Sequence, residues 1–147
     1  MDLIVAETMI NIEETLAAVD AASTVCELPI MCTMTVDADG SIFSGGNAIE
    51  AAVSLEAAGA DAVGVNCSVG PDQLVSVIRN IKENVSIPVI AIGGITKDNV
   101  KELSSSGICG IAVISAIYGQ KDIKKASEER MELVTAVLLL ATLSAIS

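Results

Sequence analysis

The chain has 147 residues and a formal net charge of −11, with four cysteines and no histidine. This length suits one domain. Nucleic acids and anionic membranes are excluded as expected partners, because both would repel so acidic a protein. Catalytic and metal sites built on imidazole are excluded as well. The cysteines are widely spaced and nothing after Met1 resembles a leader peptide, so we expect a cytoplasmic protein with reduced thiols.

The first half of the chain alternates apolar runs with segments that begin on helix-capping residues. Asn11 and Asn47 each precede a glutamate by three residues, a pattern typical of a helix N-terminus. We expect these helices to end near Ala22 and Ala58. The predicted strands of this half are Leu3–Ala6, Pro29–Val36 and Val63–Asn66.

The second half continues the alternation. A third helix is expected from Pro71, since proline is favoured at the first helical position. Strands are predicted at Val89–Ile92 and Ile111–Ile114, with a helix over Lys97–Leu103 between them and Thr96 as its N-cap. A last helix is expected from Asp122.

Five strand–helix units in succession predict an α/β fold with a parallel sheet, which we expect to form a single domain over residues 1–147. Right-handed crossovers would place the carboxyl ends of all five strands at one edge. The residues expected at that edge are Glu7, Asp37, Asn66, Cys67, Ser68, Gly93, Gly94 and Ser115. We predict any ligand site there. The DADG loop at residues 37–40 is expected to be a turn, since it is too short for a calcium loop.

A glycine pair follows the fourth predicted strand, and Ile114-Ser115 ends the fifth. Without side chains, Gly93 and Gly94 let backbone N–H groups approach an anion. Two such strand ends side by side would form a phosphate site. The alternative is that the glycine pair is an ordinary tight turn.

These residues resemble a known family. The sequences IPVIAIGGITKDNV, at 87–100, and GIAVISAIYG, at 110–119, are similar to the end of thiamine phosphate synthase. The resemblance implies the last two strands of a (β/α)8 barrel. It also implies that backbone groups of Gly93, Gly94, Ile114 and Ser115 hold a ligand phosphate.

The first half resembles the homocysteine S-methyltransferase domain of cobalamin-dependent methionine synthase. The matching sequences are DLIVAET, IMCTMTVDADGSIFSGG and DAVGVNCSVGPDQL, at 2–8, 30–46 and 61–74. The resemblance implies that Glu7 helps to hold homocysteine and that Cys67 is one of three zinc thiolates. The family's other two thiolates end its last barrel strand, where this chain reads VISAIYG. Cys32 lies within a predicted strand and Cys109 before one, so we expect no working zinc centre.

Together the two resemblances run as strands four to eight of one barrel, joined near Val85–Pro88. This suggests a methyltransferase-like part, 1–86, and a phosphate-binding part, 87–147, in a recombined or engineered chain; a natural divergent relative is the other explanation. Five strands cannot close a barrel. The fold is therefore either a partial barrel completed by a partner or an open, flavodoxin-like sheet with helices on both faces.

The segment Leu133–Ile146 carries no charge and is short for a membrane span. We expect it to pack on the sheet or on a second copy, and so predict a homo-oligomer. The predicted function is a scaffold that binds phosphate or a phosphorylated small molecule without a complete active site. The alternatives are thiol methyl transfer and a thiamine phosphate synthase-like transferase.

Overall fold

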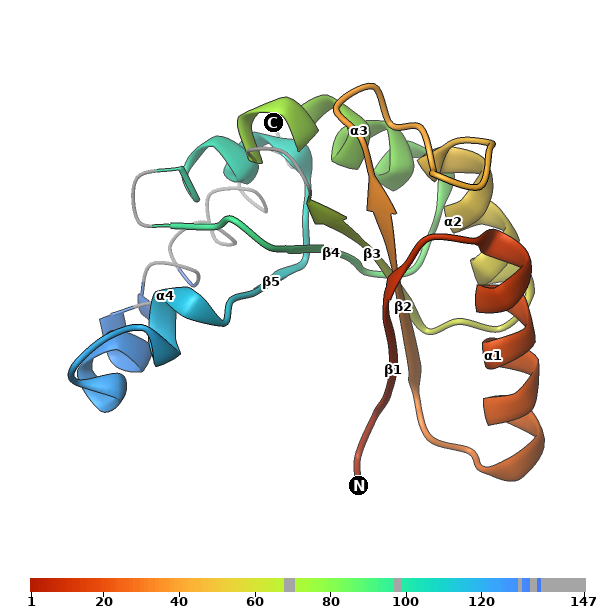
Figure 1. The fold of residues 1–147 in the computed structure, drawn as a ribbon, viewed down its shortest axis with the longest axis horizontal. Coiled ribbons are helices and arrows are strands. Elements are labelled where there is room, and N and C mark those ends of the chain that lie inside the picture. Colours follow the sequence, from red (N-terminus) through yellow and green to blue (C-terminus); the bar gives the residue numbers. More distant parts are fainter. Residues whose placement is uncertain (68–70, 97–98, 130, 133–134, 136–147) are drawn as a thin grey trace.

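The computed structural model describes residues 1–67, 71–96, 99–129, 131–132 and 135. Five parallel strands form one sheet in the order of the chain, β1-β2-β3-β4-β5 (Figure 1). Each predicted strand is present; Val89–Ile92 has its predicted limits, and the ends of the other four are shifted by a few residues. The strands are β1 (Ile4–Met9), β2 (Ile30–Val36), β3 (Ala62–Cys67), β4 (Val89–Ile92) and β5 (Gly110–Ala112).

The three longer helices connect the first four strands. Asn11 caps α1 (Ile12–Val25) and Asn47 caps α2 (Ala48–Ala57), each side chain accepting two backbone N–H groups of the first turn. Pro71 is the first residue of α3 (Pro71–Asn84). The two asparagine caps and the proline therefore do what the sequence pattern predicts.

These helices settle the choice between the two predicted architectures. Figure 1 shows α1, α2 and α3 along one side of a curved sheet. A sheet whose strands follow chain order with right-handed crossovers puts every connecting helix on the same side. The partial-barrel architecture is confirmed, and the open, flavodoxin-like alternative with helices on both faces is wrong. Completion of the barrel by a partner stays a prediction. The core lies between sheet and helices, where Val19, Leu55 and Ile78 are 0% exposed.

The other face of the sheet carries side chains that point toward the inside of the curve. Alternation along the strands places Thr33, Gly64 and Ile90 side by side on this face, because each is the register partner of the next. Val5 lies on the same face and is 44% exposed. This face is therefore buried at its centre, where Thr33 is 0% exposed, and more exposed to solvent at β1.

The region after β4 differs from its prediction. The helix expected at Lys97–Leu103 is, in its described part, a turn followed by a 3-10 helix, η1 (Glu102–Ser106). Serine favours local side-chain hydrogen bonds over a regular helix, and the Ser106 hydroxyl donates to the Leu103 carbonyl over 2.6 Å. Gly107 then ends η1 with a φ of 79°.

The last strand is also shorter than predicted. β5 stops at Ala112 rather than Ile114, because the backbone turns at Ile114 into the short helix α4 (Ser115–Tyr118). Residues 123–129 are helical, and the Asp122 carboxylate accepts the Lys125 N–H, as predicted for the last helix.

The prediction for Leu133–Ile146 lies almost entirely outside the described residues. Within the described part of the chain, no helix has the length and apolarity needed to cross a membrane.

Candidate functional site

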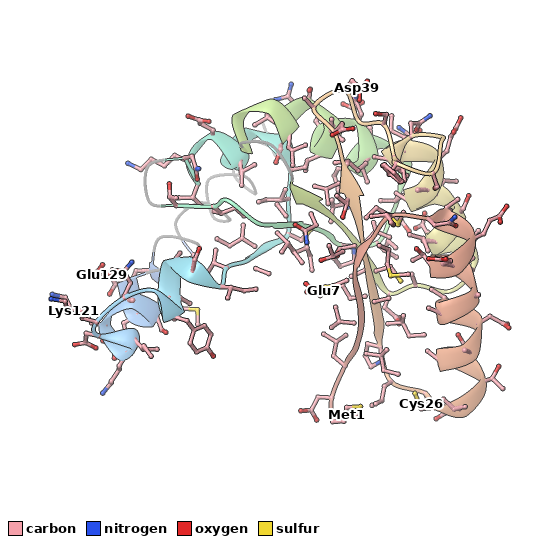
Figure 2. The ribbon with its side chains drawn as sticks, viewed as in Figure 1. Met1, Glu7, Cys26, Asp39, Lys121 and Glu129 are labelled. Atoms are coloured by element: carbon pink, nitrogen blue, oxygen red, sulfur yellow. The ribbon has the colours of Figure 1, made fainter. Side chains whose placement is uncertain are left out.

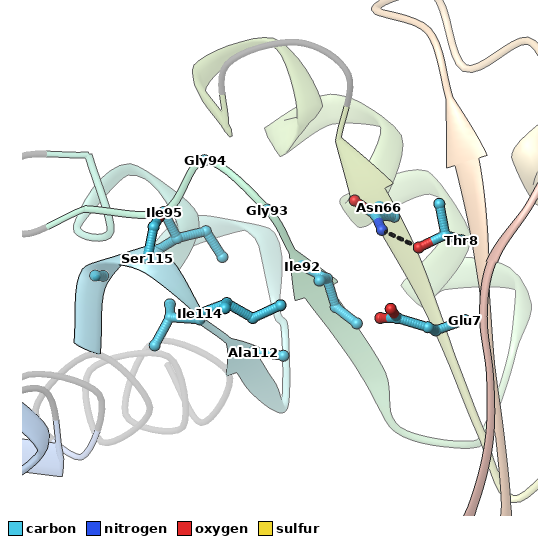
Figure 3. A pocket seen from close by; sticks show the side chains of 12 residues that line it. Glu7, Thr8, Asn66, Ile92, Gly93, Gly94, Ile95, Ala112, Ile114 and Ser115 are labelled. Atoms are coloured by element: carbon cyan, nitrogen blue, oxygen red, sulfur yellow. Dashed lines mark hydrogen bonds between the residues drawn. The ribbon is translucent and has the colours of Figure 1, made fainter. Parts of the chain in front are cut away.

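A cavity of about 360 Å3 opens at the carboxyl edge of the sheet, where β1, β3, β4 and β5 end (Figure 3). This volume falls within the range of small-molecule sites. One wall comes from the ends of β4 and β5, and the other from the ends of β1 and β3. The cavity is lined by Glu7, Thr8, Asn66, Ile92, Gly93, Gly94, Ile95, Ala112, Val113, Ile114, Ser115 and Ala116.

The first wall is made largely of backbone. Gly93 has a φ of 90° and Gly94 a φ of 61°, values that side-chain-bearing residues rarely adopt. Among the hydrogen bonds of the described residues, none uses the backbone N–H of Gly94, Ile95, Ile114 or Ser115 as its donor. Two neighbouring strand ends thus bring to one cavity four residues whose N–H groups have no acceptor in the described part of the chain.

The opposite wall carries the polar side chains. Figure 2 shows Glu7 projecting from β1 on the side away from α1, and Figure 3 shows its carboxylate directed into the cavity. The Asn66 side-chain amide donates to the Thr8 hydroxyl over 2.6 Å (Figure 3). This bond joins β1 to β3 across β2.

Thr8 holds this wall in an unusual conformation. Its φ of 59° makes it the one described residue other than glycine with a positive φ. For a β-branched residue this conformation costs about 1–2 kcal/mol. The Thr8 N–H donates to the buried Thr33 hydroxyl over 3.1 Å, and the register of β1 on β2 shifts between Ala6 and Met9. Glu7 and Thr8 lie within this register shift, and such irregularities are common beside functional sites.

The structure brings most of the predicted site residues together. Glu7, Gly93, Gly94, Ile114 and Ser115 line the same cavity. The Cys67 backbone ends β3, but its side chain lies outside the described part of the structure. Ser68 also lies outside it.

Asp37 lines a separate, more apolar cavity of about 300 Å3 with Ile10, Thr35 and Phe43. Asp39 lies in a turn, as predicted, and its carboxylate accepts the Ser41 N–H over 2.9 Å. Hydrogen bonds from Ser41, the side chain first and the backbone second, hold the pKa of Asp39 below its usual value.

The sequence pattern does not predict two residues that act at or beside the cavity. Thr8 ends the matching segment DLIVAET, and nothing in the pattern signals a positive φ for threonine. Asn99 stands in the matching segment IPVIAIGGITKDNV without a predicted role. Its side-chain amide donates to the Gly94 carbonyl over 2.9 Å, and its side-chain oxygen accepts the Thr96 N–H over 2.8 Å. An amide side chain three positions after a threonine resembles a capping box, and this is the signal in the sequence that could have identified Asn99.

The zinc site implied by the methyltransferase resemblance does not fit these residues. A catalytic zinc needs three protein ligands converging on one point. Cys32 is buried in β2, and burial raises the pKa of its thiol from 9.0 to about 11. Cys109 precedes β5 and so lies at the amino end of the strand, away from the cavity. In the described ranges, no three Asp, Glu or Cys side chains are grouped to hold a metal.

Comparison with known proteins supports both resemblances. The family model "Homocysteine S-methyltransferase" matches residues 1–107, which cross the predicted junction near Val85–Pro88. The thiamine-phosphate synthase of Pyrococcus furiosus is 44% identical over 98 residues, which are 61% of this chain and 47% of that protein. The chain thus spans about half the length of the thiamine-phosphate synthases it matches.

Solved structures of related fold also superimpose on this chain. The thiamine phosphate pyrophosphorylase of Pyrococcus furiosus superimposes with a TM-score of 0.67 at 31% identity, covering 92% of this chain and 69% of that one. The (S)-3-O-geranylgeranylglyceryl phosphate synthase of Thermoplasma acidophilum, in complex with sn-glycerol-1-phosphate, has a TM-score of 0.59 at 21% identity, with 90% and 63% coverage. The second likeness shows the fold alone. The chain therefore belongs to the homocysteine S-methyltransferase family through residues 1–107. Over the 92% of its length that superimposes on the Pyrococcus furiosus pyrophosphorylase, it belongs to the family of the thiamine phosphate synthases.

Proposed function

We propose that the cavity binds the phosphate group of a small molecule, as the phosphate-binding part of a thiamine phosphate synthase-like transferase. The observation that carries this proposal is that four residues lining one cavity, Gly94, Ile95, Ile114 and Ser115, have backbone N–H groups without an acceptor among the described residues. Backbone N–H groups converging from successive turns form an anion site even in an acidic protein, because their dipoles act locally.

The relatives support the same ligand class. The Pyrococcus furiosus protein named above is a thiamine-phosphate synthase. Its name contains a phosphorylated small molecule. Among the described lining residues, Glu7 is the one charged side chain. The proposal is therefore for binding a phosphorylated ligand, and the described residues that line the cavity include no lysine or arginine.

The test compares thiamine phosphate with thiamine, which lacks the phosphate, while backbone amides are followed by NMR. We expect thiamine phosphate and inorganic phosphate at millimolar concentration to shift the amide signals of Gly94, Ile95 and Ser115. Thiamine should leave them in place. If no phosphate compound moves these signals, the proposal is wrong.

A pair of variants at Ser115 separates charge from shape. Ser115 is exposed at the start of α4, so Ser115→Asn and Ser115→Asp should both fold. A carboxylate about 5 Å from a phosphate costs about 3 kcal/mol per unit charge at an effective dielectric constant near 20, and less where water screens it. Ser115→Asp should therefore weaken phosphate binding at least tenfold, while Ser115→Asn stays close to the parent. Equal affinities in the two variants would place the phosphate elsewhere.

The second candidate is thiol methyl transfer, which the family match over residues 1–107 and the Glu7 carboxylate in the cavity favour. One variant distinguishes the two proposals. If the cavity binds phosphate, Glu7→Gln removes a like charge and should strengthen phosphate binding severalfold. If Glu7 holds homocysteine, the same change should weaken homocysteine binding. Zinc analysis of protein purified with zinc is the companion measurement, and a value below a tenth of an equivalent would reject methyl transfer.

A further inference from the structure

Asn99 joins the two sides of the loop that follows β4. Its side-chain NH2 donates to the Gly94 carbonyl, and its side-chain oxygen accepts the Thr96 N–H. The second bond is half of a capping box, with Thr96 in the cap position and Asn99 three residues later accepting its N–H. Asn99 itself does not line the cavity. Its side chain is thus committed to the loop.

The position of Asn99 is fixed by its neighbour in the core. Val100 is 1% exposed, and its N–H donates to the Thr96 carbonyl over 3.1 Å. On the other side of the loop, Ile95 is 5% exposed. Ile95 and Val100 therefore anchor the two sides of the loop in the core. This holds Asn99 in place, so that its side chain can fix the orientation of the peptide group between Gly94 and Ile95.

We propose that Asn99 is a positioning residue for phosphate, acting through the Gly94–Ile95 peptide group; this inference rests on the proposed function. No described peptide bond is cis, that between Gly94 and Ile95 included, so the Ile95 N–H points opposite to the Gly94 carbonyl. A carbonyl directed at Asn99 therefore directs the Ile95 N–H away from Asn99. Gly94, with a φ of 61°, would otherwise rotate easily, because glycine has little steric restraint.

Asparagine is suited to this task because it offers a donor and an acceptor on one short side chain. Asn99→Ala removes both. Asn99→Asp keeps the acceptor for the Thr96 N–H, and with it the capping box, but has no donor for the Gly94 carbonyl. The Asp variant therefore preserves the local fold while freeing the peptide group.

The test measures phosphate binding by residue-resolved NMR, with inorganic phosphate as the probe. In Asn99→Ala, we expect at least a tenfold loss of phosphate affinity. At saturating phosphate the shift of the Ile95 amide should be lost, whereas the shift of the Ser115 amide, on the β5 side of the cavity, should remain. A residue that merely stabilises the fold would not separate the two amides in this way.

Asn84 gives a matched control. Its side-chain NH2 also donates to a backbone carbonyl, that of Asn80, over 2.7 Å at the end of α3. Asn84→Ala removes one such bond, whereas Asn99→Ala removes two, and Asn84→Ala should leave phosphate affinity unchanged. Asn99→Asp is measured at about 1 M salt, where the Debye length is near 3 Å and repulsion by its added charge is screened.

The outcomes separate this inference from the proposed function. If the parent protein does not bind phosphate, the proposed function and the role of Asn99 both fall. If the parent binds phosphate, and Asn99→Ala and Asn99→Asp each bind it as tightly as the parent does, the role of Asn99 alone is overturned.

Discussion

Gly64 lies where two strands and a neighbouring side chain leave no room for a methyl group. A Cβ built at Gly64 would lie 2.6 Å from the Ile90 carbonyl oxygen on β4 and 3.0 Å from the Thr33 Cγ2 on β2. The first contact is with backbone, which cannot move unless β3 and β4 separate. We therefore expect Gly64→Ala to destabilise the protein, although alanine is the smallest possible addition.

Gly110 provides the matched control on the same face of the sheet. A Cβ there would meet nothing closer than the Ile90 Cγ1 at 4.0 Å, an ordinary contact. Overpacking of a tight core costs about 1–3 kcal/mol, and we expect Gly64→Ala to fall in this range. Gly110→Ala should instead be neutral or stabilise by up to about 1 kcal/mol, because alanine restricts the unfolded chain.

Urea unfolding followed by far-ultraviolet circular dichroism measures both variants. Each kcal/mol corresponds to about 2–4 °C in melting temperature for a domain of this size, so thermal scans provide a second check. If Gly64→Ala unfolds within about 0.5 kcal/mol of the parent protein, the scatter usual for harmless substitutions, the crowding argument is wrong. The same would follow if the two alanine variants lost equal stability.

Three further results are expected. Leu55→Ala should cost about 2–5 kcal/mol in urea unfolding, because Leu55 is 0% exposed between α2 and the sheet. Hydrogen bonds from the Ser86 side chain and backbone lower the pKa of Glu56. Their stabilisation is present above the ordinary value of 4.5 and is lost as the pH falls through the lowered pKa, so Glu56→Gln should flatten the acid limb of the stability profile. Iodoacetamide at pH 8 should label exposed Cys109 but not Cys32 until urea unfolds the protein, as peptide mass spectrometry would show.

The sequence was sufficient for the sheet and for the edge on which the cavity lies. Buried parallel strands are apolar over several consecutive residues, and Val89–Ile92 has the same limits in the pattern and in the structure. Asn47 and Pro71 mark helix starts by local chemistry that does not depend on distant residues. Once strands and helices alternate, the handedness of the crossovers places the strand ends together.

Features that depend on contacts between distant residues could not be predicted in this way. The conformation of Thr8 is held by Thr33 and Asn66, which are 25 and 58 residues away. The short η1 in place of a helix results from competition among local hydrogen bonds that propensity alone does not decide. In both places the sequence gives the composition of the loop, whereas its backbone angles depend on the folded neighbours.

The two family relationships meet in a single cavity, and their charges work against each other. The β1 and β3 side, which carries the methyltransferase-like residues, contributes the Glu7 carboxylate; the β4 and β5 side contributes neutral N–H groups. If the proposed function is right, a phosphate in this cavity would be attracted by dipoles whose effect fades within a few ångströms and repelled by the Glu7 charge across the space. The directions of the nearby N–H groups would then decide the binding energy, because the net charge opposes binding. For this reason a residue such as Asn99, which touches no ligand but fixes the direction of one peptide group, should affect affinity more than the total charge of the protein does.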